Sequence, residues 1–104
     1  MDADDEKLVT LARAARVRTG AAEGAAVRDD MGRTYAAATV ALSTLSLSAL
    51  QAAVAAAVSS GVHILEAAAV VTEGAGVAAD DQRVLAELGV DAPLVADPSG
   101  TVRS

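Results

Sequence analysis

The sequence predicts an α/β fold, a three-layer α/β/α sandwich with a mixed central sheet. Segments with helical spacing of apolar residues alternate with short segments rich in Ala and Val, in the order αββαβαβ. The length of 104 residues suits one domain, and no linker or internal repeat divides the chain. Helices that alternate with strands in this way cover both faces of a sheet. We therefore expect a single domain over residues 1–104 with four or five strands.

The first part of the chain predicts a helix followed by a β-hairpin. Asp4–Arg18 has apolar residues at helical spacing, with acids at its start and Arg residues near its end, which suits the helix dipole. Gly20 is placed to end this helix. The segment Gly24–Val40 predicts a strand, a tight turn and a second strand. The turn is expected at three residues that favour turns, Asp29, Asp30 and Gly32.

A second helix is predicted from about Ser48 to Ser60, and Gly61 follows as its end. Ser48 and Gln51 have the spacing of a capping box, in which each side chain accepts a hydrogen bond from the backbone N–H of the other. Such a cap contributes about 1 kcal/mol. We expect this helix to be a packing element, with an apolar stripe formed by Leu47, Leu50, Val54 and Val58.

The remainder of the chain predicts one more helix between two strands. The expected elements are a buried central strand at His63–Glu73, a helix at Asp80–Leu88 ended by Gly89, and a short strand at Pro93–Asp97. The segment Gly74–Gly76 is expected to be a loop, and Asp80 or Asp81 is expected to cap the helix. Pro98–Gly100 is expected to turn the chain into a last edge segment.

Composition excludes several classes of function. The net charge is −6, which argues against a nucleic-acid surface that neutralises phosphates. The absence of Cys removes disulfides, thiolate nucleophiles and sulfur ligands for metals. The acidic start MDADDEK is unlike a signal peptide, and no apolar run reaches the roughly 20 residues of a membrane span. We expect a cytoplasmic protein that binds neither nucleic acid nor membranes.

No reactive constellation can be assembled from the remaining polar residues. His63 is the only imidazole, no Cys or second His is available to share a metal with it, and no Ser-His-acid order stands out nearby. The Gly74-x-Gly76 loop lacks the Lys-Ser/Thr of a P-loop and the third Gly of a dinucleotide fingerprint. Asp80 and Asp81 are oxygen ligands of the kind that hard cations take, but first-turn acids are usually caps. We therefore expect no catalytic residue, no metal ligand and no cofactor.

Several of these segments together resemble the cytidine deaminases. The residues Gly24-Ala25-Ala26, the acidic turn with Gly32, Tyr35 and then Thr39-Val40 are similar to the opening of that family. There, a second strand ends in Asn-x-Glu and a helix begins with Cys-Ala-Glu-Arg. A later loop, Pro-Cys-Gly-x-Cys-Arg-Gln-Val-Leu, opens a third helix, where this chain has Gln82-Arg83-Val84-Leu85. The resemblance covers about residues 24–88, and the order of elements is the same.

The resemblance implies that the residues that carry out the family's chemistry are replaced. The family uses three zinc ligands and a Glu that moves protons between a metal-bound water and the base. By alignment, Ser48 stands at the first zinc ligand and Leu50 at the catalytic Glu, while Ala78 and Asp81 stand at the two Cys ligands. The Asn and Glu that recognise the ribose correspond to Thr39 and Ala41. We expect a degenerate member that binds no zinc and deaminates no cytidine.

Three classes of function remain open on the sequence. The first is a catalytically inactive protein with a structural, regulatory or protein-interaction role. The second is a nucleoside or nucleotide binder that keeps the family pocket. The replacement of the family's sugar-recognition Asn and Glu by Thr39 and Ala41 counts against it. The third is an enzyme with an unrecognised arrangement, against which the lack of a reactive constellation counts. We take the first as our interpretation, and the sequence does not name a protein partner.

The second helix also predicts self-association. Small or apolar residues surround most of its circumference between Ala52 and Val58, and a helix that is apolar all round needs cover on more than one side. Small cytidine deaminases, which the chain resembles, are dimers or tetramers assembled through the layer that contains this helix. We therefore expect a homo-oligomer, a dimer or tetramer, in which Val54, Val58 and nearby Ala residues divide between core and interface.

Overall fold

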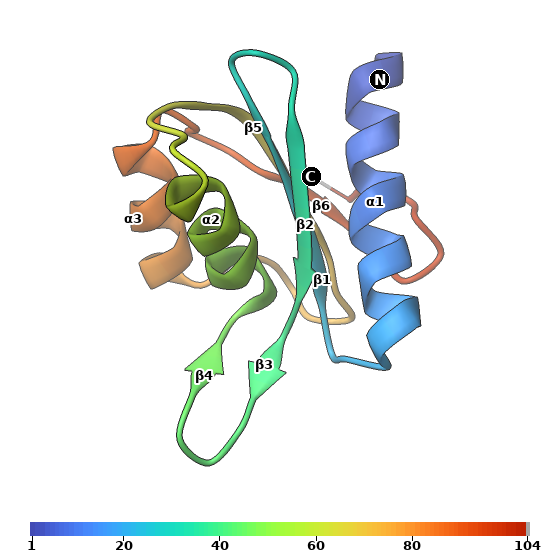
Figure 1. Ribbon diagram of the computed structural model, residues 1–104. Coiled ribbons are helices and arrows are strands. Elements are labelled where there is room, and N and C mark those ends of the chain that lie inside the picture. The colour runs from blue at the N-terminus through green and yellow to red at the C-terminus, as the bar shows by residue number, and fades with distance from the viewer. Residues whose placement is uncertain (104) are drawn as a thin grey trace.

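The structure, a computed structural model that describes residues 1–103, confirms the predicted α/β fold with a mixed sheet (Figure 1). Its helices are α1 (Ala3–Thr19), α2 (Ala49–Ser59) and α3 (Ala79–Glu87). Its strands are β1 (Gly24–Asp29), β2 (Thr34–Ala38), β3 (Val40–Ala41), β4 (Ser46–Leu47), β5 (Leu65–Val71) and β6 (Leu94–Ala96). The predicted order of helices and principal strands is therefore present.

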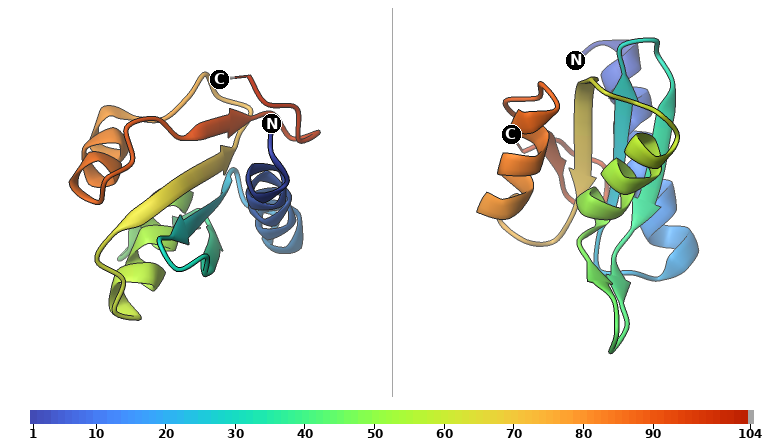
Figure 2. Two further views of the ribbon diagram at one scale, coloured as in Figure 1. Left: turned by 90° about the horizontal axis from the view of Figure 1, so that it is seen from above. Right: turned by 60° about the vertical axis from the view of Figure 1, so that its left-hand side comes forward.

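The main sheet has the order β2-β1-β5-β6. β1 is antiparallel to both β2 and β5, whereas β5 and β6 are parallel and are connected through α3. Helix α1 covers one face of this sheet, and α2 and α3 cover the other (Figures 1 and 2). Because both faces are covered, every residue of β1 is buried, and five of the seven residues of β5 are buried.

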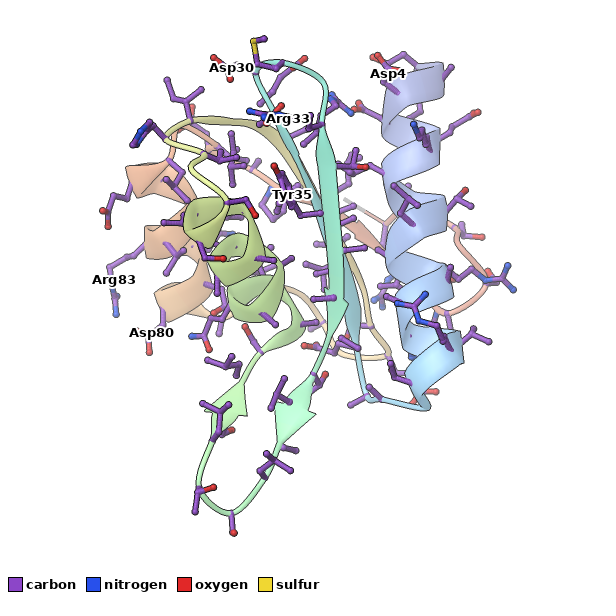
Figure 3. All side chains as sticks on the ribbon, in the orientation of Figure 1. Asp4, Asp30, Arg33, Tyr35, Asp80 and Arg83 are labelled. Carbon is purple, nitrogen blue, oxygen red and sulfur yellow. The ribbon has the colours of Figure 1, made fainter. Side chains whose placement is uncertain are left out.

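Two apolar clusters fill the spaces between these layers. The cluster under α2 and α3 includes Val27, Leu50, Leu65 and Leu85, and Tyr35 of β2 packs against it (Figure 3). The cluster under α1 is built from small and branched residues, namely Leu8, Val9, Ala12, Ala26, Ala69, Val71 and Ala96. The small side chains of the Ala-rich strands let the helices lie close to the sheet, so that the core forms without a fully buried aromatic residue.

The contact of α1 with β1 depends on Gly24. A Cβ atom at position 24 would overlap the carbonyl oxygen of Ala12 and would lie 2.9 Å from the backbone nitrogen of Arg16. The other end of α1 is held by Arg28 of β1, whose side chain donates to the carbonyl of Asp4 at 3.1 Å and to the carboxylate of Asp5 at 3.2 Å. The first residue of the Gly-Ala-Ala segment therefore sets the distance between helix and sheet.

The turn between β1 and β2 is organised by the buried carboxylate of Asp29. One carboxylate oxygen accepts the backbone N–H groups of Met31 at 2.9 Å and Arg33 at 2.8 Å, and the other accepts the Arg33 side chain at 2.7 Å. Burial alone would raise the pKa of Asp29, but the hydrogen bonds from Arg33 and Met31 outweigh it and lower the pKa below its ordinary value. The predicted turn at residues 29–32 is confirmed.

Because the pKa of Asp29 is lower in the folded chain than in the unfolded chain, its contribution to stability is present above about pH 4 and is lost as pH falls further. We expect Asp29→Asn to lower the urea midpoint at pH 7. The variant should also show a smaller change of that midpoint between pH 5 and pH 3, which lie about one unit either side of the pKa of a free carboxyl group. The neighbouring exposed Asp30→Asn is the control. Equal midpoints for wild type and Asp29→Asn at pH 7 would contradict this role.

The structure corrects the sequence prediction after β2. The second strand was expected to reach Val40, but β2 ends at Ala38, and β3 and β4 form a separate two-stranded hairpin that extends away from the sheet (Figures 1 and 2). The side chains of Leu42 and Leu45 in this hairpin are exposed. The strands are only two residues long, so the pattern of apolar alternation that identifies a strand is too short to be seen.

The predicted capping box of α2 is confirmed. The Gln51 N–H donates to the Ser48 hydroxyl at 3.0 Å, and the Ser48 N–H donates to the Gln51 side-chain oxygen at 3.0 Å. The predicted apolar stripe is correct for Leu50 and Val54, which are buried, but Val58 is 47% exposed. The buried face of α2 is completed by small residues instead, Ala49, Ala53 and Ala57.

The predicted cap of α3 is wrong. The N-cap residue is Ala78, and no side chain caps the helix. Asp80 instead pairs with Arg83 on the exposed surface (Figure 3), and Asp81 is buried. The last predicted edge segment is confirmed by a single antiparallel bridge between Ala96 and Val102. In the part of the chain that the structure describes, no helix has the length and apolar character needed to cross a membrane.

Candidate functional site

A small cavity lies where α2 and α3 begin, beside β5. Its volume is about 150 Å³. The cavity is lined by the residue before β1, by the first residues of the two helices, by one residue of β5 and by the loop before α3: Glu23, Ser48, Leu50, Val70, Gly76, Val77, Ala78 and Asp81. Two helix N-termini therefore meet at one recess, an arrangement in which backbone N–H groups and first-turn side chains can act on a bound molecule.

Four of the six positions singled out from the sequence line this cavity. They are Ser48 and Leu50 from the start of α2, and Ala78 and Asp81 from the start of α3. The other two, Thr39 and Ala41, are not among the lining residues. Thr39 instead exchanges hydrogen bonds with Glu23, whose N–H donates to the Thr39 hydroxyl at 3.0 Å, and Ala41 is exposed on β3.

The side chains in the cavity offer few reactive groups. Leu50 is 1% exposed and belongs to the apolar core. The Ser48 hydroxyl already accepts the Gln51 N–H of the capping box. Ala78, Val70 and Val77 provide apolar walls. Only the carboxylates of Glu23 and Asp81 remain as free polar groups, so the cavity has two acids and no basic side chain.

Asp81 is unusual for a charged residue because it is only 7% exposed. Its side chain takes part in none of the hydrogen bonds or ion pairs found among residues 1–103, whereas the adjacent Asp80 pairs with Arg83. No fully enclosed side-chain oxygen or nitrogen in these residues lacks a partner. The Asp81 oxygens accept no hydrogen bond within residues 1–103, so they keep some contact with solvent, and Asp81 is one of the residues that line the cavity.

Sequence reasoning missed Glu23. It lies directly before β1, exchanges hydrogen bonds with Thr39 and is one of the residues that line the cavity. The signal in the sequence was weak, because a single acid before a strand is most often solvated. Only the topology, which places β1 next to β5 and opposite the start of α2, brings Glu23 to the residues of the two helices.

The residues of the cavity do not fit a zinc ion. Structural and catalytic zinc sites use Cys, His and carboxylate ligands in sets of three or four. No group of three or more His, Cys, Asp or Glu side chains within residues 1–103 is arranged to hold a metal. His63 is exposed in the loop after α2 and lines a different hollow. We therefore assign no chemical step to a zinc ion in this protein.

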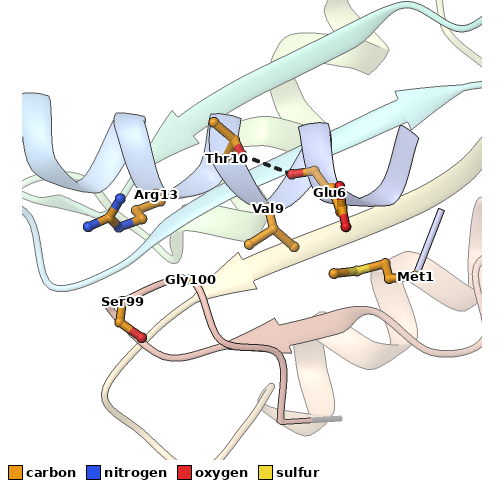
Figure 4. A pocket seen from close by; sticks show the side chains of 7 residues that line it. All are labelled: Met1, Glu6, Val9, Thr10, Arg13, Ser99 and Gly100. Atoms are coloured by element: carbon orange, nitrogen blue, oxygen red, sulfur yellow. Dashed lines mark hydrogen bonds between the residues drawn. The ribbon is translucent and has the colours of Figure 1, made fainter. Parts of the chain in front are cut away.

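Two other hollows lie outside this cavity. One is between α1 and the loop after β6, where Glu6, Thr10, Arg13 and Ser99 face open space (Figure 4). The Thr10 hydroxyl there is bound to the Glu6 carbonyl at 3.0 Å, and Arg13 is bound to the Pro98 carbonyl at 2.9 Å. The other is an apolar groove between α2 and α3, bordered by Val54, Val58, Val62, His63, Val84, Glu87 and Leu88. In neither hollow does a lining hydroxyl hydrogen-bond to a carboxylate or an imidazole of another lining residue.

Comparison with known proteins shows which family has this three-layer α/β fold and this recess at the start of two helices. The family model described as cytidine deaminase-like matches residues 1–100, and the chain therefore belongs to the cytidine deaminase-like family. The predicted family membership is confirmed. No curated protein matches the sequence.

Two solved structures are similar to this chain. The crystal structure of cytidine deaminase from Burkholderia pseudomallei has a TM-score of 0.80 and 26% sequence identity, covering 99% of this chain and 91% of that one. The crystal structure of cytidine deaminase from Mycobacterium leprae has a TM-score of 0.74 and 21% identity, covering 98% and 93%, which shows the shared fold. The likeness extends over nearly the whole length of each protein.

Proposed function

We propose that this chain is a catalytically inactive member of the cytidine deaminase-like family with a structural or protein-interaction role. The supporting observation is the cavity at the start of α2 and α3, where Leu50 and Ala78 lie at the positions aligned with the catalytic Glu and a zinc ligand. Zinc deaminases activate a water on a metal held by His and Cys ligands and move its proton through that Glu. A Leu side chain transfers no proton, and Ala binds no metal.

We expect the purified protein to form no uridine from cytidine and no deoxyuridine from deoxycytidine. The cavity has neither a set of residues that would hold the metal with its water nor a Glu at the aligned position that would carry the proton. Loss of ultraviolet absorbance on deamination is the measurement, with and without added zinc, and an active cytidine deaminase run in parallel as the control. Turnover that disappears when Asp81 or Glu23 is changed would contradict the proposal and would assign catalysis to those carboxylates.

The interaction role is proposed to be self-association through the layer that contains α2. Between Arg33 and Glu66 the sequence has no Asp, Glu, Lys or Arg, so β2, the β3–β4 hairpin and α2 form one uncharged segment in a chain of net charge −6. The exposed large apolar residues of this segment are Leu42, Leu45, Val58 and Ile64. Interface cores are depleted of charge, and an uncharged surface avoids the repulsion between two acidic copies.

We expect the wild type to be a dimer or tetramer and Ala56→Glu to shift it towards monomer. Ala56 is exposed on α2, and a carboxylate placed there would be buried without a partner on association. Light scattering behind a sizing column measures the mass. Ala14→Glu, at an exposed position of α1 on the other side of the sheet, is the control and should leave the mass unchanged. A wild-type mass near 10.3 kDa at micromolar concentration would reject self-association.

A second candidate, a nucleoside or nucleotide binder, is favoured only by the position of the cavity in the fold. The volume of about 150 Å³ is below the range of about 300–1,000 Å³ typical of small-molecule sites, which argues against a whole nucleoside. The two acids would also repel a nucleotide phosphate. A thermal-shift panel of nucleosides and nucleotides should give no specific stabilisation.

A further inference from the structure

The cavity at the start of α2 and α3 has a carboxylate that the protein itself does not use. Asp81 is 7% exposed, has no hydrogen-bond or ion-pair partner among residues 1–103, and is one of the residues that line the cavity. Burying a charge without a partner is costly. The N-terminal dipole of α3 offsets part of that cost, since Asp81 lies in the first turn, but the dipole provides no hydrogen-bond donor to the cavity side.

The residues around Asp81 indicate which kind of ligand would pair with its carboxylate. Glu23, the other acid of the cavity, adds a second negative charge, and no Lys, Arg or His is present in the lining. Leu50, Val70 and Val77 form apolar walls. A molecule suited to this recess is therefore positively charged and carries N–H donors at one end and a small apolar body at the other.

We propose that this cavity binds a small organic ammonium ion, with the ammonium group against the carboxylates of Asp81 and Glu23 and an aliphatic body against Leu50, Val70 and Val77. The volume is that of about five waters, which suits a ligand of a few non-hydrogen atoms. The net charge of −6 would also raise the local concentration of a cation. This binding activity goes beyond the proposed structural role.

A hydrated metal ion is a poorer match to the same cavity. Hard divalent cations take six or more oxygen ligands and keep part of their hydration shell. The cavity offers carboxylates from only two residues, and its apolar walls give no hydrogen bonds to retained waters. An ammonium ion needs fewer acceptors, because it has three N–H donors and an alkyl chain that gains from contact with the walls.

The test is an NMR titration of ¹⁵N-labelled protein at low ionic strength with three probes that share a three-carbon body: propylammonium, n-propanol and propionate. We expect propylammonium alone to give saturable shifts at the amides of Ser48, Leu50, Ala78 and Asp81, with a dissociation constant of roughly millimolar order, as its few atoms allow. Asp81→Asn, and separately Glu23→Gln, should weaken binding, the first by at least about tenfold. The adjacent Asp80→Asn is the matched control and should bind as the wild type does.

The outcomes separate the possibilities. Equal binding of n-propanol and propylammonium would show that the cavity selects only an apolar body, and the proposal would be wrong. Unchanged affinity in both Asp81→Asn and Glu23→Gln would exclude the carboxylates. Saturation of the same amides by Mg²⁺ without any response to propylammonium would make this a metal site and would also overturn the proposal. If Asp81→Asn does not fold, the affinity of Glu23→Gln relative to Asp80→Asn decides the question.

Discussion

Gly24→Ala is expected to destabilise the protein by about 3 kcal/mol, at the upper end of what an added methyl group costs in a packed core. The new Cβ would overlap the carbonyl oxygen of Ala12 and would lie 2.9 Å from the nitrogen of Arg16, and both are backbone atoms of α1. A side chain could rotate away, but here the whole helix must move from the sheet. Since a domain of this size has a free energy of unfolding of about 5–15 kcal/mol, this is a large fraction of the total.

Urea denaturation followed by circular dichroism measures this effect. The control is Gly76→Ala, because a Cβ at position 76 meets nothing within 4 Å and the residue has no positive φ. We expect Gly76→Ala to unfold at the wild-type midpoint. If Gly24→Ala unfolded at that midpoint too, α1 would be able to shift without loss of packing, and the close contact of helix and strand would not be a determinant of the fold.

Much of the fold could be predicted because local signals agreed with one another. Gly20 ends α1 with a φ of 67°, as its place after a helical pattern indicated. The Ser48 and Gln51 pair forms the expected capping box, and Asp29 organises the expected turn. Each of these features is decided by residues within four positions along the chain, and such features are the ones that a sequence pattern reveals.

The features that were missed depend on contacts between distant parts of the chain. Asp81 has the sequence position of a helix cap, but the approach of α3 to β5 and α2 places its carboxylate in the cavity. The β3–β4 hairpin has strands of two residues and no turn-forming Gly or Asn, so nothing local predicted it. Glu23 joins the cavity only through the pairing of β1 in the sheet.

The candidate site was predicted in position through the family resemblance and not through its own chemistry. Ser48 and Leu50 are distant in the sequence from Ala78 and Asp81, and the structure brings the two pairs to one cavity. The ribose positions Thr39 and Ala41 do not join them, because Thr39 is bound to Glu23 and the chain then leaves the sheet for β3. Of the positions that the resemblance singled out, those at the starts of α2 and α3 line the cavity and those after β2 do not.

If this chain has lost the metal-binding side chains of its family but has kept the recess that held them, Cys residues at the three aligned ligand positions should create a zinc site. The variant is Ser48→Cys, Ala78→Cys and Asp81→Cys, which directs three thiolates into the cavity and leaves a fourth position for water. We expect a dissociation constant for zinc of about nanomolar or tighter, in the range of structural zinc sites. Loss of the Ser48 cap costs about 1 kcal/mol, which zinc binding outweighs.

The control variant places Cys at three exposed neighbouring positions, Ser46, Ala79 and Asp80, whose side chains do not line the cavity. It has the same number of thiols without a shared recess. We expect this control variant to bind zinc weakly and its free energy of unfolding to be unchanged by zinc. Equal zinc affinity in both triple variants would show that three thiols bind zinc wherever they lie, and the shared cavity would have no part in it.

Elemental analysis of the zinc content per chain, after expression in zinc-supplemented medium and extensive dialysis, is the most direct measurement. The prediction is no stoichiometric zinc in the wild type and one zinc per chain in the Ser48→Cys, Ala78→Cys, Asp81→Cys variant. One zinc per chain in the wild type would contradict the loss of the zinc site, and the proposed inactive role would fail with it.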